Sequence, residues 1–173
     1  MKIKDYITFV NESKIYQYGC VMIDINVKNW NEITSFIKEE DIFVEEGLEK
    51  EPHLTLLYGL HSDVTEEQVI EKLKSFNEVN ININGIDIFE NEKCDVVKFN
   101  VDITEQLQSM HESLRELPHT TKYNDYKPHI TIGYVKKGKG KKYIKSDYNY
   151  SFNSNKVVYS YTTKNKFKFN LNE

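Results

Sequence analysis

The sequence has little cysteine and no long apolar run. Its 173 residues contain only two cysteines, Cys20 and Cys94, which lie far apart in apolar, strand-like settings. This spacing gives a disulfide no support, so we expect buried free thiols, as in cytosolic proteins. No apolar run approaches the roughly 20 residues that a membrane-spanning helix needs. Because residues 1–6 also lack the apolar core of a signal peptide, we predict a cytoplasmic protein without a membrane segment.

An excess of basic charge is also absent. The net charge is −4, whereas proteins that bind long nucleic acids usually present a basic surface. We therefore expect a small nucleotide as partner and no long duplex. Basic residues do cluster at 136–142, a run that is either a solvated loop or a mobile flap. The richness in Lys, Asn, Ile and Tyr is typical of an AT-rich genome, such as that of a phage or a low-GC bacterium.

One short pattern occurs twice, at residues 52–59 (PHLTLLYG) and 128–135 (PHITIGYV). Each copy reads Pro-His-apolar-Thr-apolar and continues into a Tyr and a Gly. In a β-strand, residues i and i+2 point to the same face. His53 therefore shares a face with Thr55, and His129 shares one with Thr131, while the apolar residues between them point towards a core.

The order of elements around the pattern repeats as well: a strand, a helix, a polar loop and then the strand with the histidine. Thr65 and Gln68 form a capping box at one helix start, and Thr104 can cap another. The expected helices cover residues 5–17, 29–37, 65–76 and 104–117. The expected strands cover 20–25, 53–58, 81–88 with a break at Gly85, 97–101, 129–135, 157–161 and 167–171.

No Pro/Ser-rich linker separates the two halves. Hydrophobic residues make up 39% of the chain, enough for a real core. We predict an α/β (α+β) protein that forms one domain over residues 1–173, with lobes at approximately 18–90 and 94–171. We expect a monomer.

Three site chemistries are weighed against these residues. Two histidines are too few for a zinc site, which takes three or four ligands, so no metal or cofactor is expected. No Gly-x-Ser-x-Gly elbow is present. Paired imidazoles can instead remove a proton from a ribose hydroxyl and protonate the leaving oxygen of a phosphodiester. His53, Thr55, His129 and Thr131 are the predicted catalytic residues, with the threonine hydroxyls donating to phosphate oxygens. Which histidine is the acid is left open.

Aromatic and basic residues near the pattern supply candidates for substrate binding. Tyr58 and Tyr134 lie five residues after their histidines, so in an unbroken strand they face away and pack. Tyr148 and Tyr150 are read as loop residues that could form a lid with the basic run. The candidates for binding bases or phosphate are Tyr16, Tyr18, Lys127 and Tyr143.

The paired sequences His53-Leu54-Thr55-Leu56 and His129-Ile130-Thr131-Ile132 resemble the motifs of the two-histidine (2H) phosphoesterase superfamily, over roughly residues 18–171. The resemblance implies a bilobal fold of two pseudo-symmetric antiparallel-sheet lobes with helices outside. It also implies that the two motif strands line a central cleft and act on a phosphodiester without a metal.

Within that superfamily, residues 18–22, Trp30 and residues 52–59 are most similar to phage anti-CBASS nucleases. This resemblance implies hydrolysis of 3′–5′ bonds in cyclic di- or trinucleotide immune messengers, in the host cytoplasm. The chain has no second Trp, so Tyr or Phe would have to stack on bases. An RNA 2′,3′-cyclic phosphodiesterase or 2′–5′ ligase-like enzyme, a 2′–5′ oligoadenylate phosphodiesterase and a non-cutting nucleotide sponge remain alternatives.

Overall fold

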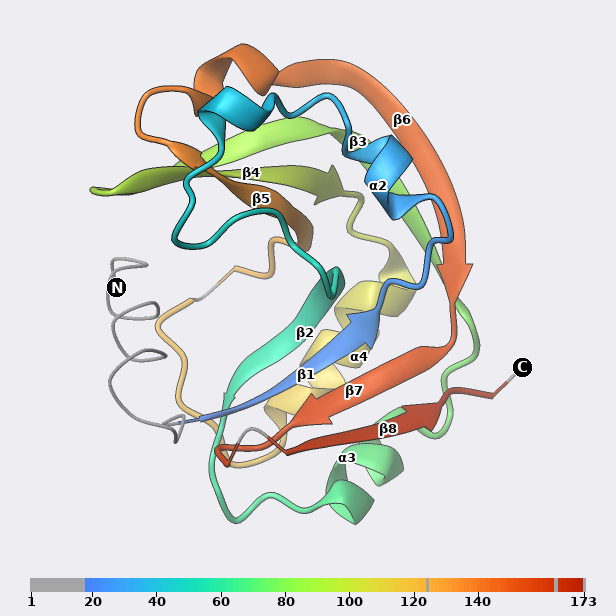
Figure 1. The fold of residues 1–173 in the computed structure, drawn as a ribbon. Coiled ribbons are helices and arrows are strands. Elements are labelled where there is room, and N and C mark those ends of the chain that lie inside the picture. Colours follow the sequence, from blue (N-terminus) through green and yellow to red (C-terminus); the bar gives the residue numbers. More distant parts are fainter. Residues whose placement is uncertain (1–17, 124, 164, 173) are drawn as a thin grey trace.

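The computed structural model describes residues 18–123, 125–163 and 165–172. Over these residues the chain forms one eight-stranded antiparallel sheet with a few short helices (Figure 1). The strands are β1 (Gly19–Asp24), β2 (His53–Leu60), β3 (Val79–Glu90), β4 (Cys94–Val101), β5 (His129–Lys136), β6 (Lys145–Ser154), β7 (Lys156–Ser160) and β8 (Lys166–Asn170). The helices are α2 (Trp30–Ile33), α3 (Glu66–Leu73) and α4 (Glu105–Arg115), with 3₁₀ turns η1 (Glu39–Asp41) and η2 (Gly140–Tyr143).

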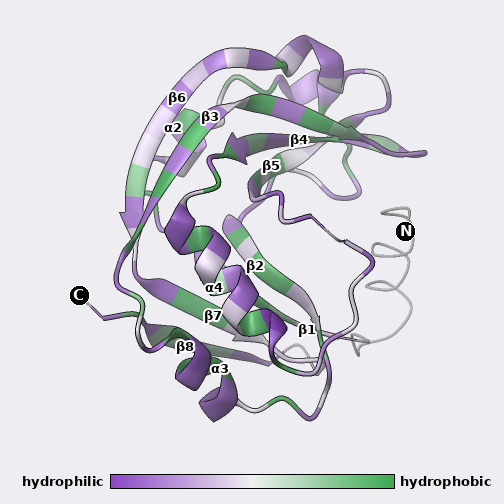
Figure 2. Ribbon diagram, turned by 180° about the vertical axis from the view of Figure 1, so that it is seen from behind, coloured by the Kyte–Doolittle hydropathy of each residue, from purple (hydrophilic) through white to green (hydrophobic). Residues whose placement is uncertain are grey.

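Two of the predicted helices begin at the predicted caps, whereas the helix predicted over residues 5–17 lies outside the described residues. Thr65 and Gln68 exchange the two hydrogen bonds of a capping box at the start of α3. At α4, the Leu107 amide donates to the Thr104 hydroxyl at 3.2 Å. Both helices are amphipathic and lie on the same side of the sheet, with α4 against β2 and α3 beside α4 (Figure 2).

The helix predicted over residues 29–37 is much shorter than expected. α2 has only four residues, and Asn29 makes no side-chain capping bond. After Ile33 the chain turns so that Phe36 packs edge-on against Phe99 of β4, with ring centroids 6.5 Å apart. Trp30 packs on the same ring at 5.9 Å. These contacts with the core outweigh the local helical pattern and cover this half of the sheet.

Residues 145–154 form strand β6, which corrects the expectation of a tyrosine lid in this segment. β6 pairs with β3 from Val79 opposite Ser154 to Ile86 opposite Lys145. Tyr148 stacks on Phe99 with ring centroids 5.2 Å apart. The predicted break at Gly85 is confirmed, because the register shifts there and Gly85 has a φ of 144°.

The sheet consists of two halves that meet at the two strands with the repeated pattern. Its order is β6-β3-β4-β5-β2-β1-β7-β8, and between β5 and β2 only Leu54 and Ile130 are paired in the ladder. The strand pairing does not follow the expected lobes at 18–90 and 94–171. β3 belongs to the half with β4 and β5, whereas β7 and β8 join β1 and β2 (Figure 1).

Each strand of the pattern is also hydrogen-bonded by the loop that precedes the other one. The loop before β2 bonds to β5, with the Glu49 amide 2.9 Å from the Ile132 carbonyl. The loop before β5 bonds to β2, with the Thr120 amide 2.8 Å from the Gly59 carbonyl. β2 and β5 pair with each other at only one position, so the two loops supply hydrogen bonds to backbone groups that the ladder leaves unpaired.

The glycines of the pattern permit these close approaches. A Cβ atom on Gly59, where φ is +115°, would lie 2.2 Å from the Thr120 carbonyl oxygen. A Cβ atom on Gly133 would lie 2.7 Å from a methyl carbon of Leu48. Both positions therefore require a residue without a side chain.

The apolar residues of the pattern lie in the core, as predicted. Leu54, Leu56, Ile130 and Ile132 are each at most 1% exposed. Within the described part of the chain, none of the helices combines the length and apolar character needed to cross a membrane.

Candidate active site

The two His-x-Thr pairs lie side by side at the centre of the sheet. Leu54 is paired with Ile130 in the antiparallel ladder. Continuing this register by one residue in each direction places His53 opposite Thr131 and Thr55 opposite His129. All four side chains are half-buried, whereas Leu54 and Ile130 are fully buried on the other face. The arrangement puts two imidazoles and two hydroxyls around one small area.

Both histidines are held by the same backbone contact. His53 Nδ1 lies 2.9 Å from the Glu51 carbonyl oxygen, and His129 Nδ1 lies 2.9 Å from the Lys127 carbonyl oxygen. Because a carbonyl oxygen can only accept, Nδ1 carries the proton in each ring. The neutral imidazole therefore has its lone pair on Nε2, which can take or return a proton. A proline lies between each histidine and its carbonyl partner and restricts the backbone at that point.

The tyrosines after the motifs lie on the same face as the histidines, which contradicts their predicted orientation. Met22 pairs with Thr55 and Cys20 pairs with Tyr58, so one extra residue is accommodated in β2 at a register shift. A β-bulge of this kind reverses the alternation of faces beyond it.

The second copy carries the same irregularity. Lys98 pairs with Thr131 and Val96 pairs with Tyr134, with a shift of register between them. The two copies therefore share a bulge as well as a motif, and Tyr134 points to the same face as Thr131.

A lysine outside both motifs lies beside His129 and Thr131. Lys98 pairs with Thr131, and its side chain is only 7% exposed. Its Nζ lies 3.5 Å from Asp87 Oδ2 and 4.7 Å from the centre of the Phe89 ring. It also donates to the side-chain oxygen of Asn100.

Phe89 and Asn100 connect this lysine to the histidine. Asn100 pairs with His129 in the ladder. The His129 ring lies edge-on to Phe89, with centroids 5.0 Å apart. In the sequence, Lys98 and Asn100 alternate with Val97, Phe99 and Val101, which indicates a polar face of a strand. Their position next to the motif follows only from the pairing of β4 with β5.

The two sides of the site differ in charge. In the ladder between β1 and β2, Met22 stands beside Thr55 and Asp24 stands beside His53. In the ladder between β4 and β5, Lys98 stands beside Thr131 and Asn100 stands beside His129. One half thus presents a cation next to its threonine, while the other presents an apolar side chain there and a carboxylate next to its histidine.

This asymmetry affects the protonation of His129. Burial lowers the pKa of His129, and the positive charges of Lys98 and His53 lower it further, against the opposing hydrogen bond to the Lys127 carbonyl. Burial likewise lowers the pKa of Lys98, while Asp87 raises it. The neutral form of His129, which can accept a proton, is therefore favoured.

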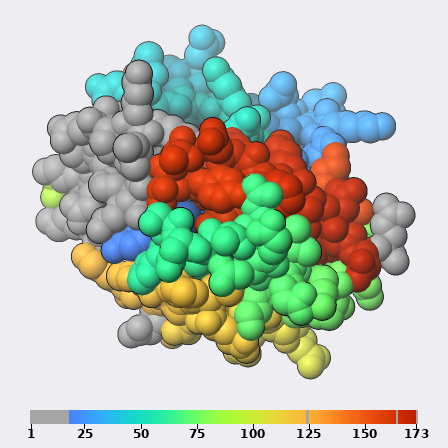
Figure 3. Space-filling model, turned by 90° about the horizontal axis from the view of Figure 1, so that it is seen from below, coloured from blue at the N-terminus to red at the C-terminus, as the bar shows by residue number. Residues whose placement is uncertain are grey.

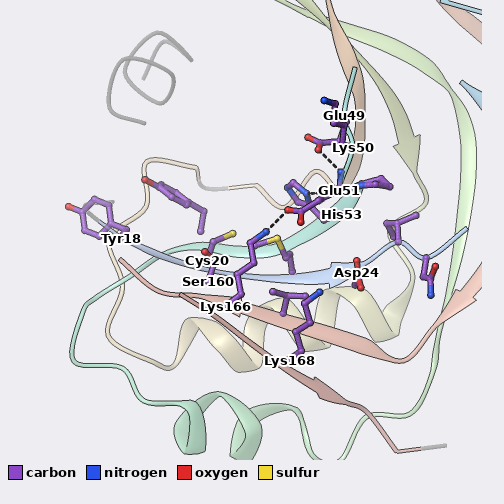
Figure 4. A pocket seen from close by; sticks show the side chains of 16 residues that line it. Tyr18, Cys20, Asp24, Glu49, Lys50, Glu51, His53, Ser160, Lys166 and Lys168 are labelled. Atoms are coloured by element: carbon purple, nitrogen blue, oxygen red, sulfur yellow. Dashed lines mark hydrogen bonds and ion pairs between the residues drawn. The ribbon is translucent and has the colours of Figure 1, made fainter. Parts of the chain in front are cut away.

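A pocket of about 350 Å³ opens beside His53 (Figure 4). Its floor is formed by β1 and β7, and lysines of β8 line its far side. Tyr18 lies in its wall and packs edge-on against Tyr58 with centroids 6.1 Å apart. Cys20 also lines it, but burial raises the pKa of this thiol to about 12, so the thiol stays neutral and is a poor nucleophile.

The remaining predicted binding residues are spread over the molecule. Lys127 is exposed and contributes its backbone carbonyl to His129. Tyr143 is 5% exposed; its hydroxyl donates to Asp41 and accepts from the Lys38 amide at 3.0 Å. Both hydrogen bonds are internal, so Tyr143 is a core residue in this structure. Tyr16 lies outside the described residues.

The basic run at 136–142 is tied to its own half of the sheet. Lys136 donates to the Glu40 carbonyl oxygen at 2.7 Å, Lys137 lies 3.2 Å from Asp95, and Lys141 lies 2.8 Å from Glu90. The idea of a mobile basic flap is not supported by these contacts. Within residues 18–123, 125–163 and 165–172, no three His, Cys, Asp or Glu side chains group as metal ligands.

Solved structures share this fold at low sequence identity. Usb1 of Kluyveromyces marxianus with uridine monophosphate has a TM-score of 0.64 and 9% identity, over 90% of this chain and 98% of that chain. LigT of E. coli complexed with 3′-AMP has a TM-score of 0.57 and 13% identity, over 90% of this chain and 95% of that chain. A structure described as a phosphoesterase has a TM-score of 0.52 and 13% identity, over 91% and 99%. No curated protein sequence matches the chain.

The sequence pattern of the 2′-5′ RNA ligase superfamily matches residues 28–157, which include both His-x-Thr motifs. This match covers most of the chain and agrees with the fold and with the twofold arrangement of the motifs. The chain belongs to the 2′-5′ RNA ligase superfamily and is an enzyme of the 2H phosphoesterase type.

Proposed function

We propose that the chain is a metal-independent phosphodiesterase that cleaves 3′–5′ bonds of cyclic di- or trinucleotides by paired-histidine catalysis. The observation that carries the proposal is the matched geometry of His53 and His129. Each ring is fixed through Nδ1 by a carbonyl oxygen at 2.9 Å, and each lies next to a threonine on one face of the sheet.

His129 is the general base and His53 the general acid in this proposal. His129 is held neutral by burial and by the neighbouring charges of Lys98 and His53. His53 takes the remaining role of acid; its ladder partner is Asp24, and Glu51 lies two residues before it in the chain. The assignment therefore rests on the lowered pKa of His129 and on the need for one acid and one base.

The reaction follows from these roles. Nε2 of His129 removes the proton from a ribose 2′-hydroxyl, whose oxygen then attacks the phosphorus atom. The bond from phosphorus to the 5′-oxygen breaks, and the protonated His53 returns a proton to that oxygen through its Nε2. Water can open the resulting cyclic phosphate when the two rings exchange roles. Thr55 and Thr131 donate hydrogen bonds to the non-bridging oxygens as negative charge develops on them.

The choice of substrate has separate support. The net charge of −4 disfavours long nucleic acid. Usb1 and LigT, which share the fold, hold single nucleotides in their structures. The cyclic immune messengers, and with them a role in phage counter-defence inside a host cell, are supported by the resemblance of residues 18–59 to anti-CBASS nucleases. RNA ends with 2′,3′-cyclic phosphates and 2′–5′ bonds fit the same site and are the second candidates.

A substrate panel in EDTA, read by mass spectrometry, tests the proposal. The panel contains 3′,3′-cyclic GMP-AMP, a cyclic trinucleotide, a 2′,3′-cyclic phosphate and a 2′–5′ oligoadenylate. We expect linear products from the cyclic messengers. If only the 2′,3′-cyclic phosphate or the 2′–5′ bond is cleaved, the substrate assignment is wrong and the second candidates replace it.

A further inference from the structure

The pocket beside His53 continues across the sheet to the edge strand β8. Two adjacent rows of ladder partners cross this part of the sheet, and each row ends in a lysine. The rows are Thr55, Met22, Val158 and Lys168, and Tyr58, Cys20, Ser160 and Lys166. Since the four strands are neighbours, the backbone of β8 lies three strand spacings, about 14 Å, from that of β2.

The two lysines point to the same side of β8. Lys166 and Lys168 are two residues apart, are both exposed and both line the pocket, whereas Phe167 between them packs against the core. Figure 4 shows both side chains reaching from β8 over the pocket, and Figure 3 shows β7 and β8, in red, at the molecular surface beside α3. A ligand in the pocket therefore meets two positive charges at its far end.

One of these charges is linked to the catalytic histidine. Lys166 Nζ forms an ion pair with the Glu51 carboxylate, and the Glu51 carbonyl oxygen accepts from His53 Nδ1 (Figure 4). Glu51 lies two residues before His53, so the Cα atoms of these two residues are at most about 7 Å apart. Over the described residues Lys168 makes no ion pair, and its charge acts on the Glu51 carboxylate only from a longer distance, so it can still bind an anion.

Lys166 and Lys168 lie too far from the motif threonines to contact the phosphate that reacts. A phosphate held between Thr55 and Thr131 lies over β2 and β5, whereas Lys168 projects from the edge strand. Between them lies a floor of Met22 and Val158, which is apolar and suits a sugar or base. Near His53 the pocket is lined by Asp24, Glu49 and Glu51 together with one cation, Lys50, whereas β8 contributes two lysines and no carboxylate.

We propose that Lys166 and Lys168 bind a second phosphate of the substrate, one nucleoside away from the phosphate that reacts. The inference rests on the proposed function and names the residues that would hold the second phosphate of a cyclic di- or trinucleotide. Lys168 makes the main contact, and Lys166 shares its charge between Glu51 and the ligand. A single nucleotide with one phosphate occupies only the catalytic end.

Binding measured without turnover tests this inference. A His129→Asn background removes the base on the far side of the site. Calorimetry then gives Kd for three linear probes: ApA with one phosphate, and pApA and ApAp with two. We expect pApA or ApAp to bind at least about tenfold more tightly than ApA, since one charge-assisted contact accounts for such a ratio. Adding Lys168→Gln should remove that preference.

Lys93→Gln is the matched control, because Lys93 is equally exposed and follows β3 in the other half of the sheet. It should keep the preference. Equal affinity for all three probes, or a preference that survives Lys168→Gln, overturns the inference. A chain that shows the preference but, with His129 restored, cleaves no member of the substrate panel contradicts the proposed function instead, so the two failures can be told apart.

Discussion

Lys98 of β4 is the ladder partner of Thr131 in β5, so a nearly buried ammonium group adjoins one of the two motif threonines. Burying a charge costs free energy, and Asp87, Asn100 and the Phe89 ring only partly offset that cost. A charge kept in such a position is well placed to attract the phosphate that Thr131 contacts.

Lys98→Met should therefore lower activity without lowering stability. The variant keeps the length of the side chain and removes the charge, and we expect kcat/KM to fall by about 10- to 100-fold, as for loss of a charged hydrogen bond. The free energy of unfolding in urea should be unchanged or higher. A large loss of stability with unchanged kcat/KM would show that Lys98 only supports the fold.

The pH profile should report the lowered pKa of His129. Protonation of His129 removes the base, so the acidic limb of kcat/KM should have an apparent pKa below the ordinary value of about 6.5. In Lys98→Met this limb should move to higher pH, because the Lys98 charge is one cause of the shift. The test is to measure kcat/KM between about pH 5 and pH 8 for both proteins. If the acidic limb has the same apparent pKa in the variant as in the wild type, Lys98 does not have the role given to it here.

The same shift affects stability with a definite sign. The pKa of His129 is lower in the folded chain than in the unfolded chain, so the unfolded chain binds the proton first as pH falls. The stabilisation that neutral His129 gives the folded chain is complete above the pKa of the unfolded chain, about 6.5. It is lost as pH falls towards the lower pKa of the folded chain. His129→Asn should reduce the loss of stability in that window, measured by urea unfolding at several pH values.

Gly59 and Gly138 allow a matched test of the loop exchange. Both have positive φ, +115° and +79°, but a Cβ atom would lie 2.2 Å from the Thr120 carbonyl oxygen at Gly59 and would meet nothing within 4 Å at Gly138. Gly138→Ala should cost about 1 kcal/mol of unfolding free energy. Gly59→Ala should cost at least about 2 kcal/mol more, since the loop must also move. Equal losses in urea unfolding would mean that the loop yields freely.

Tyr143→Phe should affect the fold and leave the site intact. The hydroxyl bonds to Asp41 and to the Lys38 amide, so its removal should lower the unfolding free energy by about 1–3 kcal/mol. The KM for any cleaved nucleotide should stay within twofold of wild type. A several-fold rise in KM with unchanged stability would show that Tyr143 contributes to substrate binding.

The position of the four motif residues could be predicted because strand alternation is regular as far as Thr55 and Thr131. Beyond these residues the register shifts add one residue to each strand, and the alternation rule then gives the wrong face for Tyr58 and Tyr134. The position of a bulge depends on the partner strand, which a local pattern does not contain.

Two further features depended on contacts between distant segments. β6 is rich in Asn, Ser and Asp, which are poor strand formers, and its order comes from pairing with β3. Lys98 was visible on a polar face, but its place next to Thr131 follows only from the register between β4 and β5. The pocket lined by Lys166 likewise needs β8 to join the half of the sheet that contains β2.

The central claim is that His53 and His129 act together as acid and base. It is tested most directly by comparing His53→Asn, His129→Asn and the double variant in cleavage of 3′,3′-cyclic GMP-AMP in EDTA. His119→Asn is the control, because its Nδ1 also lies 2.8 Å from a carbonyl oxygen two residues earlier but outside the repeated motif. We predict that each single variant loses about 10²- to 10⁴-fold in kcat, that the double variant loses little more, and that the control retains activity. Either single variant cleaving at the wild-type rate would contradict the account.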